Sequence, residues 1–73
     1  MMEDFKIKAY TKKELALMYF PESMPRTAVN HLMAWIRRCL PLWQELSASG
    51  YQPASKAFTP RQVKIITEML GEP

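Results

Sequence analysis

A cysteine and a histidine can act as nucleophile and general base, and this sequence has one of each, Cys39 and His31. Both fall in a stretch that predicts a single helix, where eight positions correspond to about 12 Å along the axis. That separation is too large for a nucleophile to pass its proton to the base. We therefore interpret Cys39 as a core residue and His31 as a surface residue, and we predict no enzymatic activity.

No motif for a metal ion or a phosphate-binding loop accompanies these two residues. No group of His, Cys, Asp and Glu has the spacing of metal ligands. The two glycines, Gly50 and Gly71, stand at predicted helix ends rather than in a glycine-rich loop. The adjacent acids Glu3 and Asp4 lie near the N-terminus and line no predicted cleft. We expect no cofactor, no metal ion and no small-molecule substrate.

The most distinctive chemistry lies on the polar side of the helix predicted for residues 25–38. This side has no acidic residue and consists of Arg26, Thr27, Asn30, His31, Ala34, Arg37 and Arg38. Arginine can bond the edge of guanine and asparagine the edge of adenine in a two-point fashion, and threonine can touch a thymine methyl group. A basic helix that closely follows another helix is typical of helix-turn-helix proteins, which place it in the major groove of double-stranded DNA.

Candidate DNA contacts follow from the position of each side chain on this helix and beyond it. The early residues Arg26, Thr27 and Asn30 are predicted to contact bases. The predicted phosphate contacts are His31, Arg37, Arg38, Lys56, Arg61 and Lys64, and Lys12 and Lys13 could add to them. Phosphate contacts fix the register of a protein on DNA without reading its sequence.

The charge distribution favours an anionic partner. Ten Lys and Arg against seven Asp and Glu give a net charge of +3, and Glu45 is the only acid between Ser23 and Thr67. The six bases of that span are therefore almost unopposed, and they form a positive surface if they converge in space.

Two short elements precede the basic helix. Residues 5–10 alternate apolar and basic side chains, which predicts a strand. Thr11 with Glu14 forms a capping box that predicts a helix from there to about Tyr19, with Leu15, Met18 and Tyr19 as its buried stripe. Pro21 ends this helix, because the residue before a proline is disfavoured in helical conformation.

The remaining elements are three helices and a loop. Ser23 and Pro25 are predicted to open the helix 25–38, whose buried side consists of Ala28, Val29, Leu32, Trp35, Ile36 and Cys39 with Met33 at its margin. A short helix starts at Pro41 and ends before Gly50. The last helix, residues 60–70, starts at a second capping box and buries Val63, Ile66, Met69 and Leu70. Residues 56–58 could pair with the N-terminal strand.

Length and composition limit the size and class of the fold. The chain has 73 residues, of which 48% are hydrophobic and 23% charged, which is typical of a folded domain. We predict one mainly α domain over residues 1–73, a small three- to four-helix, helix-turn-helix-like fold with a short strand pair. A lone cysteine, no run of eighteen apolar residues and an acidic N-terminus lead us to expect a cytoplasmic protein without a membrane partner.

Several motifs also carry a resemblance to known proteins. They are Phe5-Lys6-Ile7-Lys8-Ala9-Tyr10, Lys13-Glu14-Leu15-Ala16, Tyr19-Phe20-Pro21, Trp35-Ile36 and Phe58-Thr59-Pro60-Arg61-Gln62-Val63. Over nearly its whole length the chain resembles a family of short uncharacterised proteins of anaerobic gut bacteria, a domain of unknown function that supplies no catalytic or binding residue. More distantly it resembles small excisionase and MerR-type winged-helix domains, which implies DNA binding with the loop before the last helix as a wing.

Two functions stay open at this point. The first is a DNA-binding module, a transcriptional regulator or mobile-element accessory protein that reads DNA with helix 25–38, alone or as a homodimer. The second is a protein-interaction module that binds no nucleic acid, in which exposed parts of Trp43, Tyr51, Met24 or Met33 dock a partner. The link from Phe20 to Met24 is longer than the usual helix-turn-helix turn, which leaves the pose on DNA open.

Overall fold

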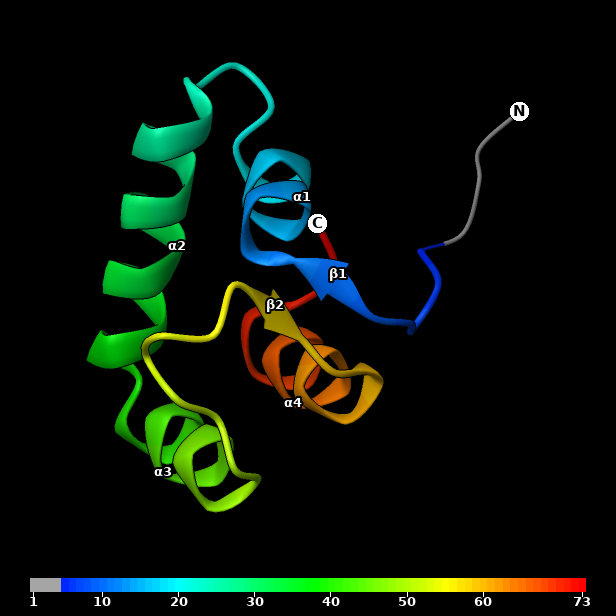
Figure 1. Cartoon of the computed structure of the whole chain (residues 1–73), viewed down its shortest axis with the longest axis vertical. Coiled ribbons are helices and arrows are strands. Elements are labelled where there is room, and N and C mark those ends of the chain that lie inside the picture. The colour runs from blue at the N-terminus through cyan, green and yellow to red at the C-terminus, as the bar shows by residue number, and fades with distance from the viewer. Residues whose placement is uncertain (1–4) are drawn as a thin grey trace.

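The computed structural model describes residues 5–73, so the acids Glu3 and Asp4 lie outside the described residues. Within this range the elements are β1 (Tyr10–Thr11), α1 (Lys12–Tyr19), α2 (Pro25–Arg38), α3 (Leu40–Ala48), β2 (Ala57–Phe58) and α4 (Pro60–Leu70). Helix α2 runs along one side of the molecule, and the β1–β2 ribbon lies between α1 and α4 (Figure 1). The mainly helical fold with an N-terminal strand that pairs just before the last helix is confirmed.

Two capping boxes determine where α1 and α4 begin. Thr11 Oγ1 accepts a hydrogen bond from the Glu14 amide at 3.0 Å, and the Glu14 carboxylate accepts one from the Thr11 amide at 2.9 Å. Thr59 and Gln62 form the same pair of bonds at the start of α4. Each box satisfies amides that the first turn of a helix would otherwise leave free. The bounds predicted for these two helices are confirmed.

Helix α2 begins without a capping box. Met24 is its N-cap residue and makes no side-chain capping bond, while Pro25 occupies the first turn. The prediction that Ser23 opens this helix is therefore wrong: its amide instead donates to Phe20 O at 3.1 Å, within the turn that leaves α1. At the other end, the extended Cys39 separates α2 from α3. The predicted range of α2 is confirmed.

The strand predicted for residues 5–10 is much shorter in the structure. Only Tyr10 and Thr11 pair with β2, in antiparallel register opposite Phe58 and Ala57. The next residue of the partner, Thr59, is already the cap of α4, and its amide donates to Gln62 Oε1. Because the partner strand ends there, residues 5–9 have no ladder to join.

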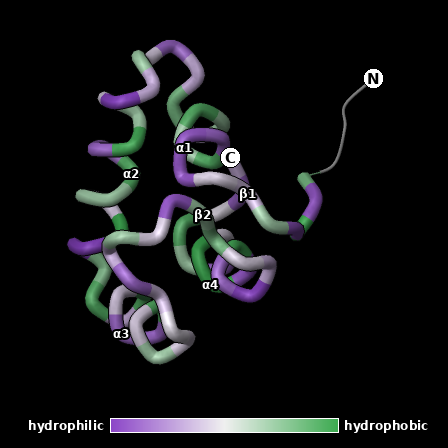
Figure 2. The backbone as a smooth tube through the Cα atoms, in the orientation of Figure 1, coloured by the Kyte–Doolittle hydropathy of each residue, from purple (hydrophilic) through white to green (hydrophobic). Residues whose placement is uncertain are grey.

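The core is formed by one side of each helix and by three aromatic residues around the ribbon. The buried hydrophobic residues are Tyr10, Leu15, Ala16, Ala28, Leu32, Met33, Ile36, Leu42, Leu46, Tyr51, Phe58, Val63 and Ile66. In Figure 2 the inner edge of α2 is mostly hydrophobic and its outer edge mostly hydrophilic. The Tyr51 and Phe58 rings stack with their centroids 5.6 Å apart, which joins the loop after α3 to the ribbon.

Three predicted core residues lie at the edge of the core instead. Trp35 is 40% exposed, and its ring packs against Tyr19 at the end of α1 and against Phe20 just after it. Met18 and Met69 are also about 40% exposed. Each lies at the margin of its helix's apolar stripe, where the neighbouring helices do not reach around far enough to cover a long side chain.

The burial of α2 gives a stability prediction with a matched control. Leu32 is fully buried, whereas Leu40 is 63% exposed. We expect Leu32→Ala to lower the free energy of unfolding by about 2 to 5 kcal/mol, because it removes buried methyl groups and leaves a cavity. Leu40→Ala removes the same atoms from a largely exposed site and should cost well under half as much. Urea unfolding followed by circular dichroism measures both, and equal losses would contradict the burial of Leu32.

Candidate nucleic-acid interface

The polar side of α2 is exposed along its whole length. Arg26, Thr27, Asn30, His31, Ala34, Arg37 and Arg38 all lie in the exposed class. The opposite side is fixed, since Ala28, Leu32 and Ile36 are fully buried and α2 packs against both α1 and α3. The helix therefore presents an acid-free face to solvent while its apolar side anchors it to the rest of the domain (Figure 2).

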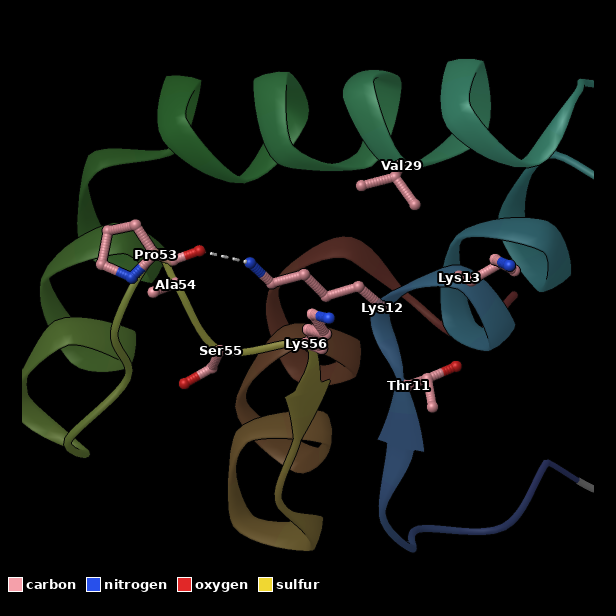
Figure 3. Close-up of a pocket in the computed structure, with 8 residues that line it drawn as sticks. All are labelled: Thr11, Lys12, Lys13, Val29, Pro53, Ala54, Ser55 and Lys56. Carbon is pink, nitrogen blue, oxygen red and sulfur yellow. Dashed lines mark hydrogen bonds between the residues drawn. The ribbon is translucent and has the colours of Figure 1, made fainter.

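A groove of about 520 Å³ lies beside this face, between α2, the start of α1 and the loop before β2. We call it the lysine groove; its lining residues are Thr11, Lys12, Lys13, Val29, Pro53, Ala54, Ser55 and Lys56 (Figure 3). Three of these eight residues carry a positive charge and none carries a negative one. The groove is thus a concave, cationic surface that adjoins α2 at Val29.

Lys12 differs from the other two lysines because it is already used within the protein. Its Nζ donates to Pro53 O at 2.9 Å and lies 4.9 Å from the centroid of the Tyr51 ring. Its backbone amide donates to Lys56 O at 2.9 Å, which extends the ribbon by one bond. Lys12 therefore holds the loop of residues 53–56 against the start of α1, whereas the exposed Lys13 and Lys56 keep their ammonium groups at the rim.

Four of the predicted DNA contacts lie on or next to the groove side of α2. At 100° per residue, Arg26, Asn30 and Arg37 point within about 100° of Val29 around the helix axis, so they share the side that adjoins the lysine groove. Lys56 lines the groove itself. The Arg37 guanidinium lies 5.8 Å from the centroid of the Trp43 ring, a cation–π distance that orients it toward α3.

The other predicted contacts point elsewhere. Thr27 and Arg38 project outward from α2, and the His31 ring packs against Phe20, with their centroids 5.5 Å apart, on the side away from the groove. Arg61 and Lys64 are exposed residues of α4, which packs against α3 and β2 and lies across the ribbon from α1 (Figure 1). The described structure therefore does not gather all the predicted basic residues on one side.

The sequence contained a signal for the groove. Residues 56–58 were predicted to pair with the N-terminal strand, and the observed register sets Thr11 opposite Ala57. That register brings Lys12 next to Lys56, so two of the three groove lysines follow from the strand pairing. The contribution of Val29 and of the Pro53–Ala54 segment could not be inferred, because it depends on how α2 packs against the ribbon.

The residues that the second hypothesis offers for docking a partner differ in their exposure. Met33 and Tyr51 are buried, and the Tyr51 hydroxyl donates to Met33 Sδ at 3.7 Å. The prediction that these two present an exposed docking surface is wrong, because the loop after α3 folds back over α2. Trp43 is half-buried, and Met24 is 73% exposed.

Within residues 5–73 no group of three or more His, Cys, Asp and Glu side chains could hold a metal ion. Across the same range, no helix is both long and apolar enough to cross a membrane.

The comparison with family models agrees with the predicted resemblance to a domain of unknown function. A profile for a domain of unknown function, DUF4248, matches residues 6–73, which is nearly the whole chain. The chain belongs to the DUF4248 family. No curated protein and no solved structure matches it. The family supplies no assigned ligand or catalytic residue, so the chemistry of the site has to be argued from the side chains described above.

The position of Lys12 gives a second stability prediction. Lys12→Met keeps most of the side-chain stem but removes the ammonium that bonds Pro53 O and lies over Tyr51, so we expect a loss of about 1 kcal/mol. Amide hydrogen exchange should also become faster in residues 53–56. Lys13→Met, at an exposed position of the same helix turn, should change neither quantity. Unaltered exchange in Lys12→Met would show that the loop is held by other contacts.

Tyr19 gives a pH prediction. Burial, reinforced by the charge of Glu72, raises the pKa of Tyr19 to about 12. The phenol in the unfolded chain has a pKa of about 10, so the folded state favours the neutral form, and this stabilisation is present below pH 10 and is lost as the pH rises from about 10 to about 12. We expect the free energy of unfolding to fall more steeply over this window in the unaltered protein than in Tyr19→Phe. Parallel curves would contradict the raised pKa.

Proposed function

We propose that this protein binds double-stranded DNA through the exposed face of α2. The observation that carries the proposal is a 14-residue helix whose solvent face contains basic, amide and hydroxyl side chains and no acid. Such a helix is about 21 Å long, and its diameter of about 10 to 12 Å with side chains fits the major groove, which is about 12 Å wide. Its apolar side is anchored on α1 and α3, so the face can approach DNA without unfolding any part of the domain.

The side chains divide into base and phosphate contacts. Arg26, Thr27 and Asn30 lie in the first two turns, where a recognition helix meets base edges, and Arg and Asn can each make two-point contacts there. Arg37 and Arg38 lie in the last turn and would hold phosphates. The exposed Ala34 between these groups leaves space for the helix backbone to come close to the bases.

We also propose a biological role, an oligomeric state and a cellular compartment for this protein. The strand, the helix pair and the loop of residues 51–59 follow the order found in excisionase and MerR-type winged-helix domains, which supports a role as a transcriptional regulator or mobile-element accessory protein. One recognition helix makes few contacts, so pairing into a homodimer would raise the affinity. We place the protein in the cytoplasm, where its one cysteine would stay reduced.

A protein-interaction module is the second candidate. Two exposed apolar side chains favour it: Met24 just before α2, 73% exposed, and Leu40 just after it, 63% exposed. These residues stand at opposite ends of a 14-residue helix, so they do not form one continuous patch. The charge pattern between them favours the nucleic-acid proposal.

A salt titration separates the two candidates. Fluorescence anisotropy with a labelled random duplex should show binding by the unaltered protein that weakens steeply as salt rises, because neutralised phosphates release their counterions. Arg37→Ala with Arg38→Ala should reduce the affinity at least tenfold while changing the thermal midpoint little, since both side chains are exposed.

Lys6→Ala with Lys8→Ala is the matched control, because it removes two exposed positive charges from outside α2. It should leave most of the affinity intact. No measurable binding at low salt would refute the DNA proposal and favour the interaction module. Equal losses from the two double variants would mean that the attraction follows net charge rather than the face of α2.

A further inference from the structure

We infer that the lysine groove seats the sugar–phosphate backbone of the DNA strand that runs beside α2, with Lys13 and Lys56 as its phosphate contacts. This inference rests on the proposed function and deepens it, since it names the part of the nucleic acid that lies in the groove. Four observations support it: the charge of the groove, the chemistry of its lining, its rigidity and its position.

The charge of the groove is available to a ligand. Lys13 and Lys56 are exposed at its rim, whereas the Lys12 ammonium is bonded to Pro53 O. The acid nearest in sequence, Glu14, accepts a hydrogen bond from the Thr11 amide in the capping box. Two lysines that line one concave surface, from the start of α1 and from the loop before β2, suit a chain of phosphates, which carries one negative charge per nucleotide.

The side chains that line the lysine groove suit the sugar–phosphate backbone of DNA rather than its bases. Val29, Pro53 and Ala54 provide an apolar surface, and no Arg, Asn or Gln side chain lines the groove to make a two-point contact with a base edge. The Thr11 hydroxyl accepts from the Glu14 amide but keeps its own O–H, so Thr11 and Ser55 can each donate a hydrogen bond to a phosphate oxygen. Ammonium groups over apolar contacts match phosphates and deoxyribose, so binding here should not depend on sequence.

The groove is held open by internal contacts. One wall is α2, whose buried side fixes Val29, and the other is the loop of residues 53–56, which Lys12 bonds to the start of α1 through its amide and its ammonium (Figure 3). A site whose walls are already fixed loses little conformational entropy when the ligand binds.

The groove lysines lie closer to the polar side of α2 than the basic residues of α4 do. It adjoins the side of α2 that carries Arg26 and Asn30, so a strand in the groove would run alongside the helix. Arg61 and Lys64 lie on α4, across the ribbon (Figure 1). The groove pair is the one next to α2, whereas α4 contributes no residue to the groove.

The test compares two double variants that remove equal charge. Lys13→Ala with Lys56→Ala should weaken binding at least tenfold at low salt and should make the slope of log affinity against log salt shallower by about 2, one unit per lost phosphate contact. The loss should be the same for duplexes of different sequence. Arg61→Ala with Lys64→Ala should leave the slope within about half a unit of that of the unaltered protein.

Each outcome bears on a different claim. The groove assignment is overturned if the slope of log affinity against log salt in the Lys13 and Lys56 variant equals that of the unaltered protein. It is also overturned if only the Arg61 and Lys64 variant has a shallower slope. Either result leaves DNA binding by α2 intact. A loss confined to particular sequences overturns the backbone assignment. No binding by the unaltered protein overturns the proposed function, and the groove assignment with it. Lys13→Gln with Lys56→Gln, which keeps longer side chains, repeats the test if the alanine variant unfolds, as judged by circular dichroism.

Discussion

Burial of Ala28, Leu32 and Ile36 against α1 and α3 is the contact on which the rest of the structure depends. Because a helix turns by about 100° per residue, fixing these three side chains also fixes the direction of every other side chain on α2. The arginines and Asn30 then have no place except solvent. The exposed, acid-free face is thus a consequence of how the core packs. A change that loosened the core would also disturb the positions of the side chains on this face.

The β1–β2 ribbon holds together segments that are far apart in sequence. Two residues of β1 pair with two of β2, and Lys12 adds a backbone bond to Lys56 and an ammonium bond to Pro53. The loop after α3 is held in turn by Tyr51, whose ring stacks on Phe58 and whose hydroxyl reaches Met33. These few contacts turn a proline-containing loop with no secondary structure of its own into one wall of a cationic groove beside α2.

Membership of the DUF4248 family places the chain among proteins whose chemistry has not been assigned, so the charges and their arrangement carry the functional argument. A net charge of +3 is modest, and it becomes informative only through its distribution. Arg26, Arg37 and the groove lysines share one region, whereas Arg38 projects outward and Arg61 and Lys64 belong to α4. An anionic polymer could use the first region continuously, which is why we propose duplex DNA as the ligand.

The sequence alone determined the four helices and the bounds of α1, α2 and α4, because capping boxes at Thr11 and Thr59, proline positions and apolar periodicity are local signals that each act within one or two turns. It also determined that α2 has one polar side without acid. Only the tertiary structure decided that Trp35 lies at the edge of the core, that Met33 and Tyr51 bury each other, and that Lys13 and Lys56 share a groove while Arg61 and Lys64 lie elsewhere. These outcomes depend on which helix packs against which and on where the loop after α3 returns, and periodicity within a single helix contains no information about its neighbours.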